Sequence, residues 1–102
     1  MQELILEAWA NRDLLKEQQY IDAVKNVIEE VDKGRLRTAE PTDDGWKVNE
    51  WVKQAILLYF GIQKMQTWEV PPFEFYDKLL LKKDYASLGV RAVPHAVARY
   101  GA

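Results

Sequence analysis

The stretch Glu50-Trp51-Val52-Lys53-Gln54-Ala55-Ile56-Leu57-Leu58-Tyr59-Phe60 decides the fold, because it contains the longest apolar run of the chain. Asn49 stands before it, at the position where a polar side chain commonly caps the first turn of a helix. Gly61 follows it, and glycine commonly ends a helix because it adopts the left-handed conformation without strain. From Ala55 to Phe60 the segment is apolar nearly all round. We therefore predict a helix from residue 50 to about residue 60 that is the central and most buried element.

Two further apolar patterns at helical spacing precede this segment, with a polar break at Asn11-Arg12-Asp13. Residues that recur three or four positions apart share one face of a helix. Gly34 stands where the second helix would need a left-handed residue at its C-terminal end. We predict two amphipathic helices with these apolar faces: Leu4, Ile5, Ala8 and Trp9 in the first, and Ile21, Val24, Ile28 and Val31 in the second.

A short β-hairpin is predicted between the second and third helices. Leu36–Glu40 and Trp46–Val48 are short segments on either side of Pro41-Thr42-Asp43-Asp44-Gly45. Proline, aspartate and glycine in this order are typical of a tight turn. The two flanking segments are therefore expected to pair as strands.

The pattern changes after the third helix. Val70-Pro71-Pro72 cannot lie inside a helix and must be extended or turning. Lys78–Tyr85 mixes basic and apolar residues and suits a short strand or a turn, and Gly89–Pro94 is typical of a short strand ended by proline. The predicted fold class is α+β and mainly helical: two N-terminal amphipathic helices, a small β-hairpin, a buried third helix, then a loop and a short strand.

The composition excludes several classes of function. The 102 residues are enough for one domain, and the formal net charge is −2 with basic and acidic residues interleaved. No basic stripe is present to neutralise phosphates, so nucleic acid is not an expected partner. No apolar run is long enough to span a bilayer, so a membrane is not an expected partner. The absence of cysteine excludes disulfides and cysteine metal sites, and it fits the reducing cytoplasm.

The usual catalytic and metal-binding constellations are missing. His95 is the only histidine, and with no cysteine it cannot begin a typical zinc site. Ser87 has no base beside it in the sequence. The carboxylates Glu29-Glu30-Asp32 and Asp43-Asp44 are explained more simply as solvated surface and turn residues than as a glycosidase-type acid pair. We therefore predict no catalytic role for His95, and no catalytic residue and no metal site in this chain.

The tryptophans and glycines offer no clear ligand site either. Trp9, Trp46 and Trp51 fall on predicted apolar faces, so we expect them to pack in the core instead of stacking on a ligand. Trp68 lies in a loop, and its role stays open. The glycines never form a phosphate-binding motif, so no cofactor site is predicted in these residues.

Arg91 has a different setting from the other charged residues. It is placed between Val90 and Ala92 in the predicted strand, with Gly89 and Pro94 at either end of that segment. A guanidinium held on an extended segment suits two-point binding of a carboxylate. An arginine on the solvent face of an edge strand is the alternative, and spacing alone does not decide between the two.

Five blocks of the sequence, in order, resemble the N-terminal domain of the tetrahydrodipicolinate N-succinyltransferase family. The resemblance covers residues 20 to 102 approximately, and no single block is decisive. The blocks are Gly34–Glu40, Trp46, Glu50–Phe60, Phe75–Lys78, and Gly89–Pro94 with Ala96–Ala102.

The resemblance implies an enzyme of the bacterial cytoplasm that acts in diaminopimelate and lysine biosynthesis. Members of the family transfer succinyl from succinyl-CoA to the amino group of ring-opened tetrahydrodipicolinate. They are homotrimers built around a left-handed parallel β-helix, with active sites between subunits. By the same resemblance, residues 1–94 are the N-terminal domain and residues 95–102 lead into the β-helix.

The family's substrate-binding arginine matches Arg91, which suits a dicarboxylate substrate. Arg99 also matches the family but has no ligand role that we can assign. The chain departs from some relatives at Gly61, where they carry arginine, and at His95, where they carry a second proline. Neither departure touches Arg91, although both leave the loop's contacts with substrate open.

The family's β-helix repeats would follow Ala102, and its CoA site and acidic catalytic residues belong to that part. We therefore predict that the isolated chain has no succinyltransferase activity. The tail after Pro94 is expected to be mobile or to pack on a neighbouring molecule, since a solenoid needs several stacked rungs. The alternative function is a stand-alone, non-catalytic module that docks a partner protein through its apolar helices and aromatic loop.

Overall fold

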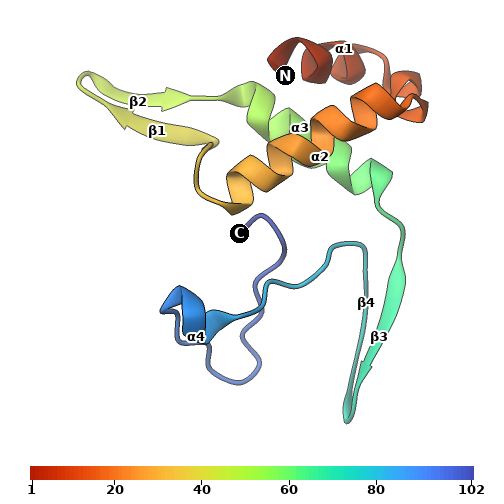
Figure 1. Cartoon of the computed structure of the whole chain (residues 1–102), viewed down its shortest axis with the longest axis vertical. Helices are drawn as coiled ribbons and strands as arrows, with labels where there is room; N and C mark the ends of the chain where they lie inside the picture. The colour runs from red at the N-terminus through yellow and green to blue at the C-terminus, as the bar shows by residue number, and fades with distance from the viewer.

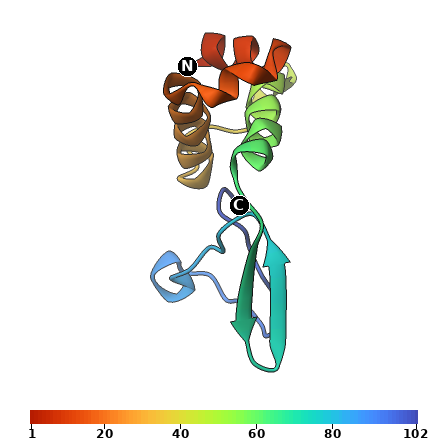
Figure 2. The ribbon, with the colours of Figure 1, turned by 90° about the vertical axis from the view of Figure 1, so that its right-hand side faces the viewer.

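The computed structural model describes all residues from Met1 to Ala102. A helical bundle forms the N-terminal part of the chain, and Figure 1 shows α2 crossing α3 with α1 alongside. Figure 2 shows that the second hairpin extends away from this bundle. The elements of the bundle are α1 (Gln2–Ala10), the 3-10 helix η1 (Arg12–Lys16), α2 (Gln18–Asp32) and α3 (Glu50–Ile62).

The three helices enclose one apolar core. The most deeply buried large side chains come from all three: Ile5 of α1, Val24 and Val27 of α2, and Val52 and Leu58 of α3. The prediction of amphipathic helices around a third helix is therefore confirmed. The expectation that α3 is the most buried element is wrong, because α2 buries five residues and α3 buries four.

The predicted break between the first two helices is a 3-10 turn. The Asn11 side chain accepts a hydrogen bond from the Asp13 backbone N–H at 3.2 Å and so caps η1. Asn11 itself has extended backbone angles, which end α1. Tyr20 of α2 then donates a hydrogen bond of 2.6 Å to Glu7 of α1, so that the polar edge of the bundle is also tied together.

Gly34 ends α2 as predicted. Its φ of 75° is in the left-handed region, and its N–H donates to the carbonyl of Val31 at 3.0 Å. The N–H of Arg35 donates to the carbonyl of Glu30 at 2.9 Å. Together these two bonds form the Schellman motif, which satisfies carbonyls that the helix leaves unpaired.

The first hairpin is confirmed, with a shorter turn than predicted. Strands β1 (Ala39–Thr42) and β2 (Gly45–Val48) pair antiparallel, and Pro41 lies opposite Trp46 instead of in the turn. The Thr42 hydroxyl donates to the Gly45 carbonyl at 3.1 Å and closes a loop of only Asp43 and Asp44. Proline is tolerated because both strands are sheet edges.

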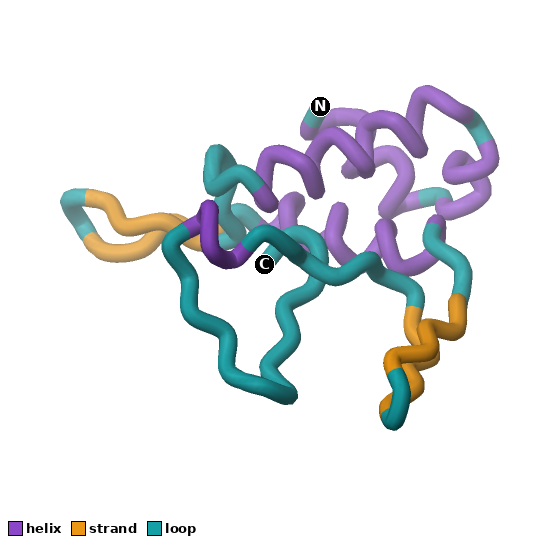
Figure 3. The backbone as a smooth tube through the Cα atoms, turned by 60° about the horizontal axis from the view of Figure 1, so that its bottom comes forward, coloured by secondary structure: helices purple, strands orange, loops and turns teal.

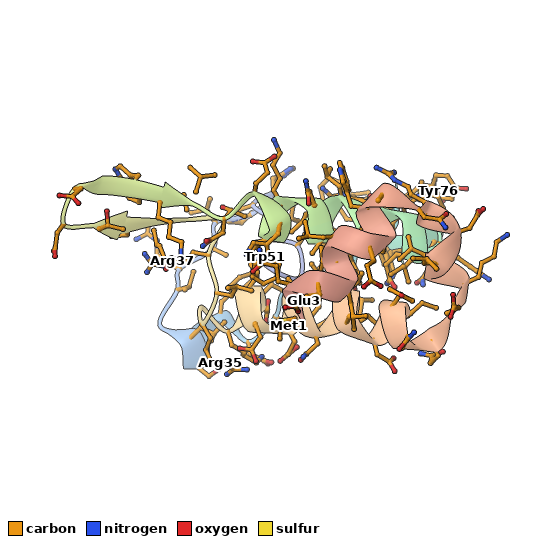
Figure 4. All side chains as sticks on the ribbon, turned by 90° about the horizontal axis from the view of Figure 1, so that it is seen from above. Met1, Glu3, Arg35, Arg37, Trp51 and Tyr76 are labelled. Atoms are coloured by element: carbon orange, nitrogen blue, oxygen red, sulfur yellow. The ribbon has the colours of Figure 1, made fainter.

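The tryptophan predictions are only partly correct. Trp9 and Trp51 are half-buried against the core. Figure 4 shows Trp51 near the N-terminal end of α1, marked by Met1 and Glu3. Figure 4 also places Arg35 and Arg37 on the connection between α2 and β1. Trp46 is wrongly assigned to the core, since it is 71% exposed on the projecting hairpin.

The predicted start of α3 at residue 50 is confirmed, but its capping bond and its C-terminal end differ from the prediction. Asn49 occupies the N-cap position but makes no capping bond with its side chain; its amide donates to the Arg37 carbonyl at 2.8 Å and joins the hairpin to the helix. Gly61 does not end α3, because the helix continues to Ile62 and turns extended at Gln63. None of the helices has the length and apolar character needed to cross a membrane.

A second hairpin, which we did not predict, follows α3. Strands β3 (Gln66–Val70) and β4 (Phe73–Asp77) pair antiparallel around Pro71-Pro72, whose connecting peptide bond is cis. The expectation that Val70-Pro71-Pro72 is extended or turning is confirmed. Figure 3 shows mainly loop after β4, apart from the short helix α4 (Tyr85–Leu88).

The predicted strand over Gly89–Pro94 is wrong, because this segment pairs with no other strand. The residues favour a strand, but no second strand supplies the ladder of hydrogen bonds. The expectation for the tail is also wrong for residues 98–102, which pack back on the chain. Leu81 forms a β-bridge with Arg99, and the Tyr100 N–H donates to the Leu80 carbonyl at 2.8 Å.

Candidate functional site

Arg91 lies on an exposed loop segment that is held at both ends. At its start, the Val90 N–H donates to the Tyr85 carbonyl at 2.9 Å, while Gly89 adopts a φ of 70° after α4. At its end, the His95 ring meets the Phe73 ring edge-on, with centroids 5.0 Å apart. The backbone that carries Arg91 is therefore anchored by both α4 and the second hairpin.

The Arg91 side chain is exposed, and its guanidinium makes no hydrogen bond or salt bridge within the chain. A free guanidinium presents several N–H donors in a fixed plane, which match the two oxygens of a carboxylate. The geometry is therefore compatible with the predicted binding role.

Arg99 is engaged within the fold, in contrast to Arg91. Its guanidinium binds the Asp77 carboxylate at two points, with N–O distances of 3.0 and 2.9 Å. It also lies over the Phe60 ring, 5.2 Å from the centroid. Lys78 donates to the Phe60 carbonyl at 2.9 Å, so the tail, the end of β4 and the end of α3 meet at one point. Arg99 is thus a structural residue of this junction.

A cleft of about 820 Å³ opens beside the second hairpin, and Arg91 is not part of it. The second hairpin forms one wall with Trp68, Val70 and Phe75, and the segment around α4 forms another with Leu80 and Leu88. Charged groups lie at the end nearest α2. We call this hollow the hairpin cleft; its lining also includes Asp32, Lys33, Glu69, Leu81, Lys82, Lys83, Asp84, Ser87 and Tyr100.

The charged end of the hairpin cleft is organised by Asp32, whose side chain is 7% exposed. Its carboxylate lies 3.2 Å from the Lys82 ammonium and 3.3 Å from the Lys33 ammonium. It also accepts a hydrogen bond of 2.9 Å from the Gly101 N–H. Lys33 also lies 3.4 Å from the Glu29 carboxylate, so two carboxylates balance two ammonium groups and leave little net charge to attract an ionic ligand.

The pKa values of this cluster follow from its contacts. Burial raises the pKa of Asp32, but hydrogen bonds from Gly101, Lys82 and Lys33 outweigh it and bring the pKa below its usual value. A hydrogen bond from Tyr100 likewise lowers the pKa of Glu29. Burial first, and then this bond, raise the pKa of Tyr100 well above its ordinary value. Asp32 and Glu29 are therefore ionised, and Tyr100 protonated, at neutral pH.

The other residues considered from the sequence do not converge on a reactive centre. The Ser87 hydroxyl donates to the Asp84 carbonyl at 2.8 Å, and His95 contacts Phe73 instead of a nucleophile. No three side chains of the types that bind metals come together. Of the carboxylates, Glu29 and Asp32 hold the tail, whereas Asp43 and Asp44 form the loop of the first hairpin.

The hairpin cleft is a feature that sequence reasoning missed. A usable signal was present, since the alternation of Gln66, Trp68 and Val70 before Pro71-Pro72 and of Phe73 and Phe75 after it is typical of a two-residue hairpin. The two prolines concealed it, because proline usually argues against a strand. No local sequence pattern could have predicted the pairing of Asp32 with Lys82, since fifty positions separate them in the chain.

A comparison with known families matches residues 1–62 to the family described as tetrahydrodipicolinate N-succinyltransferase N-terminal. Proteins named 2,3,4,5-tetrahydropyridine-2,6-dicarboxylate N-succinyltransferase are similar over nearly the whole chain. The one from Bordetella petrii is 41% identical over 112 residues, covering 100% of this chain and 41% of the relative. The one from Coxiella burnetii is 39% identical over 107 residues, covering 97% of this chain and 40% of the relative.

The chain thus spans about two fifths of the length of the curated relatives that it matches. The family match itself is confined to the helical bundle and the first hairpin, because it ends at Ile62 with α3. The similarity to the named relatives extends further and includes Arg91 and the residues of the hairpin cleft.

Proposed function

The chain belongs to the family of tetrahydrodipicolinate N-succinyltransferase N-terminal domains, and we propose that it is the substrate-side domain of such an enzyme. One observation carries this proposal: a relative with that enzyme name, from Bordetella petrii, aligns with all of the chain at 41% identity. The full-length protein would move succinyl from succinyl-CoA, its co-substrate, to the amino group of tetrahydrodipicolinate. It would act in diaminopimelate and lysine biosynthesis in the bacterial cytoplasm.

We further propose that the full-length protein is a homotrimer and that the isolated chain is inactive. The chain itself supports the second point, because no nucleophile, acid–base pair or metal cluster converges in it. Purified residues 1–102, mixed with succinyl-CoA and tetrahydrodipicolinate, should release no CoA above the uncatalysed rate. CoA release by this chain would contradict the proposal.

Arg91 is proposed to bind a carboxylate of tetrahydrodipicolinate. Three features support this role: the side chain is exposed, it has no partner in the chain, and its backbone is anchored by α4 and by the contact between His95 and Phe73. An anchored backbone lowers the conformational entropy that is lost when the guanidinium binds its ligand. A guanidinium that binds a carboxylate at two points also forms charge-assisted hydrogen bonds, which are stronger than hydrogen bonds between neutral groups.

The test is a succinyl-transfer assay on the full-length protein, comparing wild type with Arg91→Ala and Arg91→Lys. We expect Arg91→Ala to raise the KM for tetrahydrodipicolinate by about tenfold or more, which corresponds to a lost charged hydrogen bond of about 1.5–3 kcal/mol. The KM for succinyl-CoA should not change. Lysine keeps the charge but loses the bidentate geometry, so Arg91→Lys should restore only part of the affinity.

Lys25→Ala is the matched control, since Lys25 is an exposed cation of α2 with no role in the site. It removes one positive charge and should leave both KM values unchanged. An Arg91→Ala enzyme that behaves like this control would exclude the binding role. An inactive wild-type protein would instead contradict the proposed reaction.

A further inference from the structure

The part of the chain after α3 buries very little of its own surface. Leu79 is its only buried residue. Large exposed apolar patches on a protein usually mark an interaction surface. Most of the large apolar side chains that the molecule exposes lie between residues 65 and 97: Met65, Val70, Phe73, Phe75, Tyr76, Leu80, Leu88, Val90, Val93 and Val97.

Several of these side chains gather around the hairpin cleft. Val70, Phe75, Leu80 and Leu88 are all exposed to solvent, and they line the cleft together with the half-buried Trp68. At the charged end, Asp32 and Lys82 are already paired at 3.2 Å. The lining carries three carboxylates and three ammonium groups, from Asp32, Glu69, Asp84, Lys33, Lys82 and Lys83, so it has no net charge to favour an ionic ligand. Apolar side chains of a polypeptide would fit the aromatic and aliphatic walls.

The backbone of the chain itself reaches the rim of this cleft. Tyr100 lines it, the Gly101 N–H is bonded to Asp32, and the Ala102 carbonyl accepts a hydrogen bond from Lys82. The relatives are much longer than this chain, which covers 41% of the Bordetella petrii protein. A segment that follows residue 102 at about 3.3 Å per extended residue would enter the cleft within a few residues.

We propose that the polypeptide following residue 102 of the same chain fills the hairpin cleft in the full-length protein and covers its apolar walls. The inference rests on the proposed function, in that it takes this chain to be the N-terminal part of a longer enzyme. A covalently connected segment has a high effective concentration at the rim, which favours it over a second copy. The bond between Lys82 and Ala102 and the Asp32–Gly101 bond hold residues 101 and 102 at the rim of the cleft.

The test uses the full-length protein with Phe75→p-benzoylphenylalanine, which places a photo-crosslinker in the wall of the cleft. Irradiation followed by peptide mass spectrometry should join position 75 to a peptide that begins after residue 102. Tyr76→p-benzoylphenylalanine is the matched control, because neighbouring residues of a strand point to opposite faces and Tyr76 does not line the cleft. Its yield of the same cross-link should be at least several-fold lower.

Assemblies mixed from nitrogen-14 and nitrogen-15 protein identify the source of the segment. Cross-linked peptides that carry a single isotope support the proposal. Peptides that combine the two isotopes would overturn it in favour of a neighbouring copy, and cross-links confined to residues 1–102 would overturn it altogether. Succinyl transfer by wild type is measured separately, so an active protein without the cross-link contradicts this inference alone. An inactive protein that forms the cross-link contradicts only the proposed reaction.

Discussion

Leu57 and Leu58 are chemically identical neighbours on α3 that have different surroundings. Leu58 is 1% exposed in the core, whereas Leu57 is 44% exposed on the outer face. Leu58→Ala should lower the free energy of unfolding by about 2–5 kcal/mol, because it removes buried methyl groups and leaves a cavity. Leu57→Ala should change it by about 0.5 kcal/mol or less. Urea unfolding of the two variants checks this, and equal losses would contradict the described packing of α3.

Asp32 should make stability depend on pH in the acidic range. Because its pKa is lower in the folded state, its contribution is fully present above the unfolded-state pKa of about 3.9. The contribution is lost as the pH falls through the folded-state pKa. Asp32→Asn should therefore lower the free energy of unfolding at about pH 7 and flatten its decline toward about pH 3.

Urea titrations at several pH values measure how steeply the free energy of unfolding declines as the pH falls, and we call this the pH slope. Asp43→Asn is the control, since Asp43 is exposed in the loop of the first hairpin and has no charged partner. Part of the pH slope should remain in Asp32→Asn, because hydrogen bonds also lower the pKa values of Glu29 and Asp77. A pH slope identical to wild type would show that Asp32 is not held by Lys82 and Gly101 in solution.

At the level of single residues, the sequence predicted the exposure of a side chain only where the pattern was strong. Val24 and Val52 are buried as their helical spacing indicates. Trp46 is not, because the two-stranded hairpin that carries it has no third element to pack against. Apolar character indicates that a side chain can be buried; whether it is depends on a neighbour that the local sequence does not specify.

Among the helices, two glycines with different backbone angles should respond in opposite directions to the same substitution. Gly34 has a φ of 75°, where alanine costs about 1–2 kcal/mol. Gly61 lies inside α3 with ordinary helical geometry and open space around it, so Gly61→Ala should stabilise by about 0.5–1 kcal/mol. Thermal unfolding should show a lower Tm for Gly34→Ala and a higher Tm for Gly61→Ala. Shifts in the same direction would contradict the assigned C-terminal ends of α2 and α3.

At the scale of elements, helices were easier to predict than strands. The helices α1, α2 and α3, and the end of α2 at Gly34, follow from periodicity and capping, which depend on only a few neighbouring residues. The strand expected over Gly89–Pro94 shows the opposite case. The residues of this segment favour an extended backbone, but a strand forms only with a hydrogen-bonded partner strand. No segment of the chain pairs with Gly89–Pro94 in this way. The expectation that Arg91 lies in a strand was therefore wrong, because the segment is a loop.

For the whole molecule, the uneven distribution of buried residues should appear in amide hydrogen exchange. The core lies almost entirely within α1, α2 and α3, and Leu79 is its only member after Tyr59. In the purified chain, amides of α2 and α3 should exchange slowly, and those of β3 and β4 should exchange much faster. Mass spectrometry of peptides from each element measures the difference. Equal protection of both parts would show that residues 65–97 are covered even in the isolated chain.

The hairpin cleft belongs to this largest scale, and although its hairpin wall had a local signal in the sequence, the meeting of its walls had none. The end of α2 is far in sequence from its other walls, which come from the second hairpin and the residues around α4. Local patterns carry no information about such distant contacts, as the pairing of Asp32 with Lys82 illustrates. The candidate role of Arg91 came from family resemblance, and the structure adds to it the exposure of the side chain and the anchoring of its backbone.

The antiparallel contact between Leu80–Lys82 and Ala98–Tyr100 has an evolutionary consequence. The Lys82 N–H donates to the Ala98 carbonyl and the Tyr100 N–H to the Leu80 carbonyl, both at 2.8 Å, so residues 83–97 form a loop whose two ends are fastened together. Insertions or deletions in such a loop leave both anchoring segments in place. The alignment with Bordetella petrii runs over 112 positions, more than this chain contains, so the relative carries extra residues. A lineage could therefore lengthen or shorten this loop, and reshape the surroundings of Arg91, without disturbing the path of the chain that leaves the domain.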